Sequence, residues 1–212
     1  MSFPAGEVAS LAAAGCWAIG LTLFRRSVTE VGARAVNLFK GIFGTTLFLA
    51  LVLAFGFTPG SAHAQVAILL SGIVGIALGD SLLFLALGEL GAHRAALFGC
   101  LGPALTALGG WWLLGERLTA GQVAGVALAS GGVWMVVYDR RRADDAARAT
   151  ARGVVCGVLS AACQAGGVLL AKRAMEETDF VSAVTVRLGA ATIVLALVAA
   201  CLLYTSDAAD EL

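Results

Sequence analysis

The chain has 212 residues, of which 59% are hydrophobic and only 13% charged, and its mean hydropathy is +0.91. These values lie far outside the range of soluble domains and indicate a membrane protein. Its 14 basic and 14 acidic side chains cancel, which argues against a nucleic-acid partner.

Seven apolar runs are long enough to cross the roughly 30 Å hydrocarbon core of a bilayer, since a helix rises about 1.5 Å per residue. None alternates polar and apolar residues as a barrel strand would, and only helices and closed barrels satisfy their backbone in lipid. We therefore predict an all-α fold, a polytopic bundle of helices spanning the lipid bilayer. The predicted helices cover residues 8–24, 35–57, 65–87, 95–114, 118–138, 153–171 and 181–200.

The 27 glycines indicate how these helices pack, because small residues let helix backbones approach closely in a bilayer. Gly72, Gly75 and Gly79 share one face of the third helix, and the fourth and fifth helices carry glycines at 102, 109, 110, 121, 125, 131 and 132. The five cysteines lie in or beside apolar runs without a CxxC pair, so we interpret them as packing residues. We expect neither a metal site nor a cofactor.

An internal repeat appears when the chain is shifted by 147 residues against itself. Residues 6–30 then align with 153–177, so that Cys16 matches Cys163 and Arg25-Arg26 match Lys172-Arg173. Further along, Lys40 matches Arg187 and Thr45 matches Thr192. The sixth and seventh helices therefore look like a second copy of the first and second.

The repeat unit holds five helices, and this odd number makes the second copy begin on the opposite side of the membrane. Inverted repeats of this kind give many secondary transporters two related conformations around a site near the midplane. The pattern therefore predicts transport by alternating access. Because no nucleophile and base, zinc-ligand spacing or phosphate loop is recognisable, we do not expect an enzyme.

The stretch "ALGELGAHRAALFGCLGPALTALGGWWLLGERLTAGQVAGVALASGGVWMVV", residues 86–137, resembles the fourth and fifth helices of EamA-type transporters in the drug/metabolite transporter superfamily. The resemblance extends over residues 7–200, with one departure at Trp17-Ala18-Ile19, where small polar residues are common in the family. It implies ten helices in two five-helix repeats and movement of small metabolites without ATP.

A short polar hinge separates the fourth and fifth predicted helices. Gly115 is expected to end one helix and Thr119 to cap the next, with Glu116 and Arg117 at the water interface, where charge costs little. We interpret this hinge as structural, and a role in substrate binding is the alternative.

Ten helices do not fit into 212 residues, and the end of the chain suggests a reason. Residues 201–212, "CLLYTSDAADEL", resemble the translation of a transposon-type sequencing adaptor from Cys201 to Asp210. We therefore expect an adaptor-derived tail and three missing helices, whereas the alternative is a natural polar terminus. The expected organisation is a first repeat at 7–138, a charged linker at 139–152, two helices of a second repeat at 153–200, and the tail at 201–212.

Charged side chains deep in lipid are expensive and usually face a cavity or a partner. Lys40 and its repeat counterpart Arg187 either line a cavity or extend their charged ends to the interface. For Asp80 we favour a cavity role; the alternative is a carboxyl group that is neutralised by protonation or by pairing with Lys40. The full set of expected substrate-cavity residues is Trp17, Asn37, Lys40, Asp80, Gln164 and Arg187.

Two readings of membrane orientation remain open. One side holds nine bases, at 25, 26, 34, 94, 140, 141, 142, 148 and 152, and the other holds three, at 117, 172 and 173. The positive-inside rule puts the N-terminus outside, whereas the family resemblance implies an N-terminus inside. We expect a multi-pass transporter of the cell inner membrane that moves small amino-acid-like or drug-like metabolites, driven by a substrate or proton gradient. The alternatives are a membrane assembly subunit without flux and a lipid-linked flippase.

Overall fold

The computed structural model describes residues 5–138 and 150–210. Every element in these residues is helical, which confirms the predicted all-α bundle. The elements are α1 (Ala5–Val31), α2 (Ala33–Phe55), α3 (Ala62–Gly72), η1 (Ile73–Leu78), α4 (Gly79–Leu90), α5 (Ala92–Gly99), α6 (Leu101–Leu114), α7 (Ala120–Tyr138), α8 (Ala151–Lys172), η3 (Ala174–Glu176) and α9 (Phe180–Asp210). Most of the predicted linker, residues 139–149, lies outside the described residues, and Arg140, Arg141, Arg142 and Arg148 lie there.

Two predicted helices are less regular than the sequence pattern indicates. The run at 65–87 continues from α3 into α4 through η1, a π-helical segment. The run at 95–114 is divided at Cys100 into α5 and α6. Hydropathy does not distinguish these forms, because a π-helical turn keeps the same apolar residues. The π-helical segment matters for the site because it ends two residues before Asp80.

Five helical segments in the described part of the chain are long and apolar enough to span a membrane, judged by length and composition. They comprise residues 33–55, 62–90, 92–114, 151–172 and 180–202. Together with α1 and α7 they occupy the positions of the seven predicted runs. The arrangement is that of a polytopic membrane protein.

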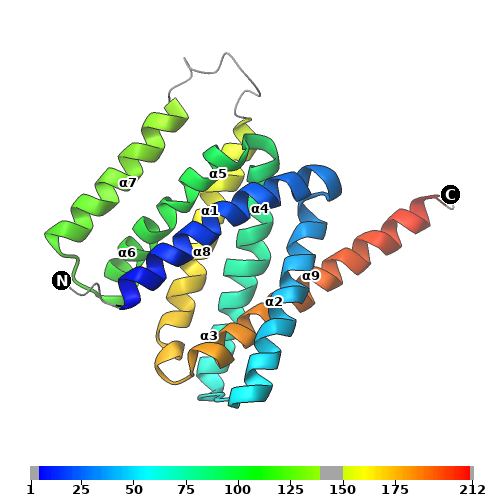
Figure 1. Cartoon of the computed structure of the whole chain (residues 1–212), viewed down its shortest axis with the longest axis horizontal. Helices are drawn as coiled ribbons and strands as arrows, with labels where there is room; N and C mark the ends of the chain where they lie inside the picture. The colour runs from blue at the N-terminus through cyan, green and yellow to red at the C-terminus, as the bar shows by residue number, and fades with distance from the viewer. Residues whose placement is uncertain (1–4, 139–149, 211–212) are drawn as a thin grey trace.

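The α3–η1–α4 rod and α8 form the centre of the bundle, with α1 crossing in front of them and α7 at one edge (Figure 1). One apolar cluster joins α1, α2, α4 and α5 around Phe84 and Leu87, both almost fully buried. A second cluster joins α4, α5 and α8 through Leu90, Phe98 and Cys156. These contacts hold the helices that carry the buried polar residues.

Glycine packing follows the expectation for the third predicted helix. Gly75 lies directly against Gly167 of α8, Gly79 lies against Gln164, and Gly72 faces the backbone of Arg187 in α9. The α7 glycines differ, because a Cβ atom at Gly121, Gly125, Gly131 or Gly132 would meet nothing within 4 Å. Close packing through glycine is therefore a property of the bundle centre and not of α7.

The two pairs of helices related by the internal repeat meet through α2 and α9. Thr45 Oγ1 and Thr192 Oγ1, which are equivalent in the repeat, lie 2.9 Å apart and share a hydrogen bond. Beyond this contact, α9 continues as a helix to Asp210, and its end projects away from the other helices (Figure 1).

Candidate functional site

Asp80 occupies the centre of a buried polar cluster at the start of α4. Its side chain is nearly inaccessible, and three elements converge on it. Lys40 of α2 pairs with Oδ2, while Gln164 Nε2 of α8 donates a hydrogen bond to Oδ1 over 3.0 Å. Lys40 Nζ also lies 5.5 Å from the centroid of the Phe84 ring, a cation–π arrangement. The carboxylate thus links α2 and α4 to α8.

Hydroxyl groups around the π-helical segment satisfy backbone carbonyls of the central rod and of α8. Ser81 Oγ donates to Ala77 O over 2.6 Å, and Ser160 Oγ of α8 donates to Gly79 O over 2.7 Å. Ser71 Oγ donates in turn to Gly167 O of α8 over 2.6 Å. A π-helical turn shifts the regular hydrogen-bond ladder, and such turns occur frequently at functional sites. These bonds fix the backbone on which Asp80 is mounted.

Asn37 and Arg187 complete the cluster. Asn37 is fully buried and donates through Nδ2 to Ser81 Oγ over 2.9 Å. Arg187 of α9 lies beside Gly75 of η1, where the absence of a side chain leaves room for its guanidinium group. The structure therefore brings together five of the six predicted cavity residues, all except Trp17, around one carboxylate or close to it.

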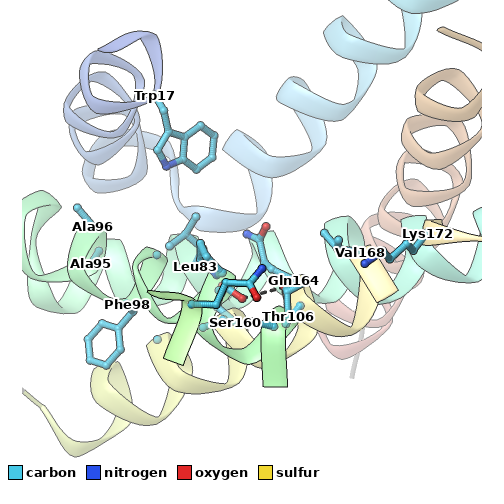
Figure 2. A pocket seen from close by; sticks show the side chains of 18 of the residues that line it. Trp17, Leu83, Ala95, Ala96, Phe98, Thr106, Ser160, Gln164, Val168 and Lys172 are labelled. Carbon is cyan, nitrogen blue, oxygen red and sulfur yellow. Dashed lines mark hydrogen bonds between the residues drawn. The ribbon is translucent and has the colours of Figure 1, made fainter. Parts of the chain in front are cut away.

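A cavity of about 590 Å³ lies on the other side of Gln164. Figure 2 shows Trp17 at one end, Lys172 at the other, and Gln164 with Thr106 between them. The wall combines apolar side chains such as Leu83 and Phe98 with the hydroxyls of Thr106 and Ser160. A volume of this size is typical of small-molecule sites.

The lining of this cavity differs from the sequence expectation. Trp17 and Gln164 contribute to its wall, whereas Asn37, Lys40, Asp80 and Arg187 do not. The reason is packing: Gln164 stands between the cavity and the carboxylate and covers Asp80 from that side. Gln164 is thus the cavity-lining residue that bonds directly to the Asp80 carboxylate, while Ser160, also in the wall, bonds to the neighbouring backbone at Gly79 O.

The hinge has the local structure that its residues indicate. Gly115 ends α6 in the left-handed region at φ 69°, and Thr119 forms reciprocal hydrogen bonds with Gln122 at the start of α7. Glu116 and Arg117 also line the cavity, so the hinge is both a structural connection between helices and part of the cavity wall.

Ion pairs tie both ends of α8 to the first repeat. At the cavity end, Glu116 Oε1 lies 2.6 Å from Lys172 Nζ. At the opposite end, Arg152 Nε lies 3.4 Å from Glu89 Oε1, and Thr150 donates to the same carboxylate. The sequence pattern did not identify Lys172 or Ser160 as a site residue. The repeat offered a signal for Lys172, which matches Arg25. It offered none for Ser160, which matches Ala13.

Metal binding has no evident location in the described residues, where no three of the His, Cys, Asp and Glu side chains are grouped closely enough. The buried cluster around Asp80 instead contains side chains of opposite charge together with amide and hydroxyl groups. Such a set can bind and release a polar solute by exchanging hydrogen bonds.

Apolar helices around a buried ion pair and a solute-sized cavity are the arrangement of a multi-pass membrane protein. The EamA-like transporter family matches residues 4–138, and the chain belongs to this family. Members of the family are transporters rather than enzymes. Neither the comparison with curated proteins nor the comparison with solved structures gives a match.

Proposed function

We propose that the protein is a secondary transporter that moves a small amino-acid-like or drug-like metabolite across the inner membrane by alternating access. The observation that carries the proposal is the ion pair between Lys40 and Asp80, which Gln164 connects to the cavity. Ionisable groups inside a membrane bundle are expensive and commonly mark a solute or proton pathway.

Gln164 provides a physical link between a solute and the ion pair. A solute that accepts the Gln164 Nε2 hydrogen now donated to Asp80 Oδ1 competes with Asp80 for that hydrogen. Loss of this bond weakens the hold of α8 on the central rod, since Asp80 then keeps only Lys40. Solute binding can thereby change how α8 packs.

The ion pairs at the two ends of α8 are placed to open and close an entrance to the transport path on each side of the membrane. The pairs Glu116–Lys172 and Glu89–Arg152 lie at opposite ends of the helix, and each has a partner that is substantially exposed. Exposed ion pairs contribute only about 0–1 kcal/mol, so they can break and form again at little cost. Breaking one pair while the other holds would open the bundle on one side.

The internal repeat supports two related conformations, one open at each end of α8. Equivalent residues that touch each other, as Thr45 and Thr192 do, lie next to the axis that relates the two copies. Inverted repeats around such an axis can exchange conformations, which converts an inward-open form into an outward-open form. A substrate or proton gradient would drive the exchange.

Uptake and efflux assays on vesicles containing the full chain test the proposal. A metabolite panel should include at least one solute whose flux depends on the protein and falls when Gln164 is replaced by Ala. Protein-free vesicles and the variant Gln65→Ala, the same change at a glutamine of α3 that does not line the cavity, serve as controls. Absence of solute-dependent flux would favour an assembly subunit, and movement of labelled lipid alone would favour a flippase.

A further inference from the structure

Arg187 of α9 carries a buried atom without a hydrogen-bond partner. Its Nε is inaccessible and finds no acceptor among the described residues. The ion pairs of the described part of the chain do not include Arg187 either. A guanidinium in a membrane bundle is normally matched by an anion or by carbonyl groups. The guanidinium therefore has an N–H donor that no acceptor among the described residues satisfies.

The charges of the cluster do not balance. Asp80 is surrounded by Lys40 and Arg187, but Lys40 occupies its Oδ2 and Gln164 occupies its Oδ1. Arg187 attracts Asp80 through space without pairing with it. Two cations and one carboxylate leave one excess positive charge, which a single added negative charge would neutralise.

Two glycines of the central rod lie against Arg187. A Cβ atom at Gly75 would lie 3.5 Å from Arg187 Nη2, at ordinary contact distance, so the guanidinium packs against the backbone of η1 at this glycine. Gly72 packs closely against the Arg187 backbone and fixes the position of α9. A second polar atom, Asn37 Oδ1, is buried without a hydrogen-bond partner among the described residues, one turn before Lys40; it can accept only from a donor elsewhere on the solute, because an ionised carboxylate has none.

We propose that Arg187 and Lys40 together bind a singly charged carboxylate group of the transported solute. This inference rests on the proposed function, and it adds the charge and the chemical class of the group recognised. The planar guanidinium matches a carboxylate through two parallel hydrogen bonds. A phosphate monoester carries about −1.5 to −2 at pH 7 and would overcompensate the single excess charge.

Ligand-dependent thermal unfolding of the purified full chain in detergent tests the site without requiring transport. Benzoate is the probe, and benzamide is its neutral analogue of nearly equal size. Benzoate should raise the unfolding midpoint of the unmodified protein, whereas benzamide should not. Arg187→Gln should weaken benzoate binding about tenfold or more, because it removes charge-assisted hydrogen bonds. Arg34→Gln, an equal change at an exposed base at the start of α2, should leave binding unchanged.

Two further variants protect the test against a folding failure. Arg187→Lys keeps the charge but loses the two-pronged geometry, so it should bind benzoate several-fold more weakly than the unmodified protein. Asp80→Asn removes the anion that competes for the two cations and should bind benzoate more tightly. Opposite effects at Arg187 and Asp80 are expected of an anion site and not of a general loss of packing.

The proposal is wrong if benzoate stabilises Arg187→Gln as well as the unmodified protein, or does not stabilise the latter at all. Weaker binding by Asp80→Asn, or a larger response to inorganic phosphate than to benzoate, would also overturn it. Flux measurements separate it from the proposed function: benzoate binding through Arg187 without any solute flux would retain the site and reject transport.

Discussion

At the residue scale, the ion pair between Lys40 and Asp80 is the feature most sensitive to a single substitution. We expect Asp80→Asn to reduce solute flux about tenfold or more and to shift its pH dependence, since removal of one partner of a buried pair costs about 3–5 kcal/mol. Lys40→Ala should impair the flux of anionic or zwitterionic solutes most. Initial rates of uptake into vesicles between pH 5 and 9 provide the measurement.

Glu30→Gln is the matched control for Asp80→Asn. Glu30 Oε1 pairs with Arg26 Nε over 3.1 Å, but both side chains are exposed, so loss of this pair should cost about 0–1 kcal/mol. Normal flux and an unchanged pH profile in Asp80→Asn would show that Asp80 serves packing rather than transport.

Glu177, in the connection between α8 and α9, makes stability depend on pH. Hydrogen bonds from Ser61, from its side chain first and then its backbone, lower the pKa of Glu177 below its usual value. A lowered pKa in the folded state stabilises the protein above the ordinary value, and this contribution is lost as the pH falls through the folded pKa. Glu177→Gln should therefore lower the unfolding midpoint at pH 7, and the difference should vanish below about pH 4.

Circular dichroism melts of both proteins across this pH range measure the effect. Glu176→Gln, the same change at the exposed neighbour, is the control. A constant difference between Glu177→Gln and the unmodified protein at all pH values would mean that the carboxylate charge is not the cause.

At the scale of elements, the crossing of η1 and α8 depends on the absence of side chains. A Cβ atom at Gly167 would lie 2.8 Å from the Cα atom of Gly75 and 3.0 Å from Ser71 O, both backbone atoms of the facing rod. Gly167→Ala should therefore push α8 away and destabilise the protein by about 1–3 kcal/mol. It should also reduce flux, because the bond between Gln164 and Asp80 spans the same crossing.

Gly166→Ala provides a closely matched control for this crossing. Its added Cβ atom would lie 3.9 Å from Val74, at ordinary contact distance, and alanine favours the helix over glycine. In denaturant or thermal unfolding in detergent, Gly167→Ala should therefore be clearly less stable than Gly166→Ala, although both replace glycine by alanine at adjacent positions. Equal stability of the two variants would contradict the observed packing of η1 against α8.

At the scale of the whole molecule, alternating access predicts that two cross-links between the repeats have different effects. Thr45→Cys with Thr192→Cys joins the contact next to the repeat axis, where relative motion is smallest, so flux should largely persist after oxidation. Glu116→Cys with Lys172→Cys, joined by a short bis-maleimide, bridges the end of the cavity and should stop flux.

Both cross-links require a background in which the five native cysteines are replaced. Gel mobility after proteolytic cleavage between the repeats measures the extent of linkage, and vesicle uptake measures flux. Thr46→Cys with Thr192→Cys is the control pair, because Thr46 is exposed and bonds within its own helix to Ile42 O. Full flux with the cavity end linked would exclude the proposed opening at Glu116 and Lys172.

The sequence by itself determined the class of fold and the family. Apolar runs long enough to cross a bilayer force helices, because lipid offers no partner for an unpaired backbone group. The hinge residues were equally informative, since left-handed Gly115 and the Thr119–Gln122 cap depend on local geometry alone. The repeat also identifies Lys40 and Arg187 as equivalent bases, and it matches Thr45 with Thr192, which are in contact in the structure.

Only the tertiary structure decided which of these side chains are in contact and which of them line the cavity. The pairing of Asp80 with Gln164 spans 84 residues of sequence, and nothing in either local pattern specifies it. The π-helical turn has no hydropathy signal. The residues that line the cavity depend on side-chain packing, such as the position of Gln164 over Asp80. Long-range contacts are set by how whole helices pack, so Gln164 became the link between cavity and ion pair only once α8 lay against the central rod.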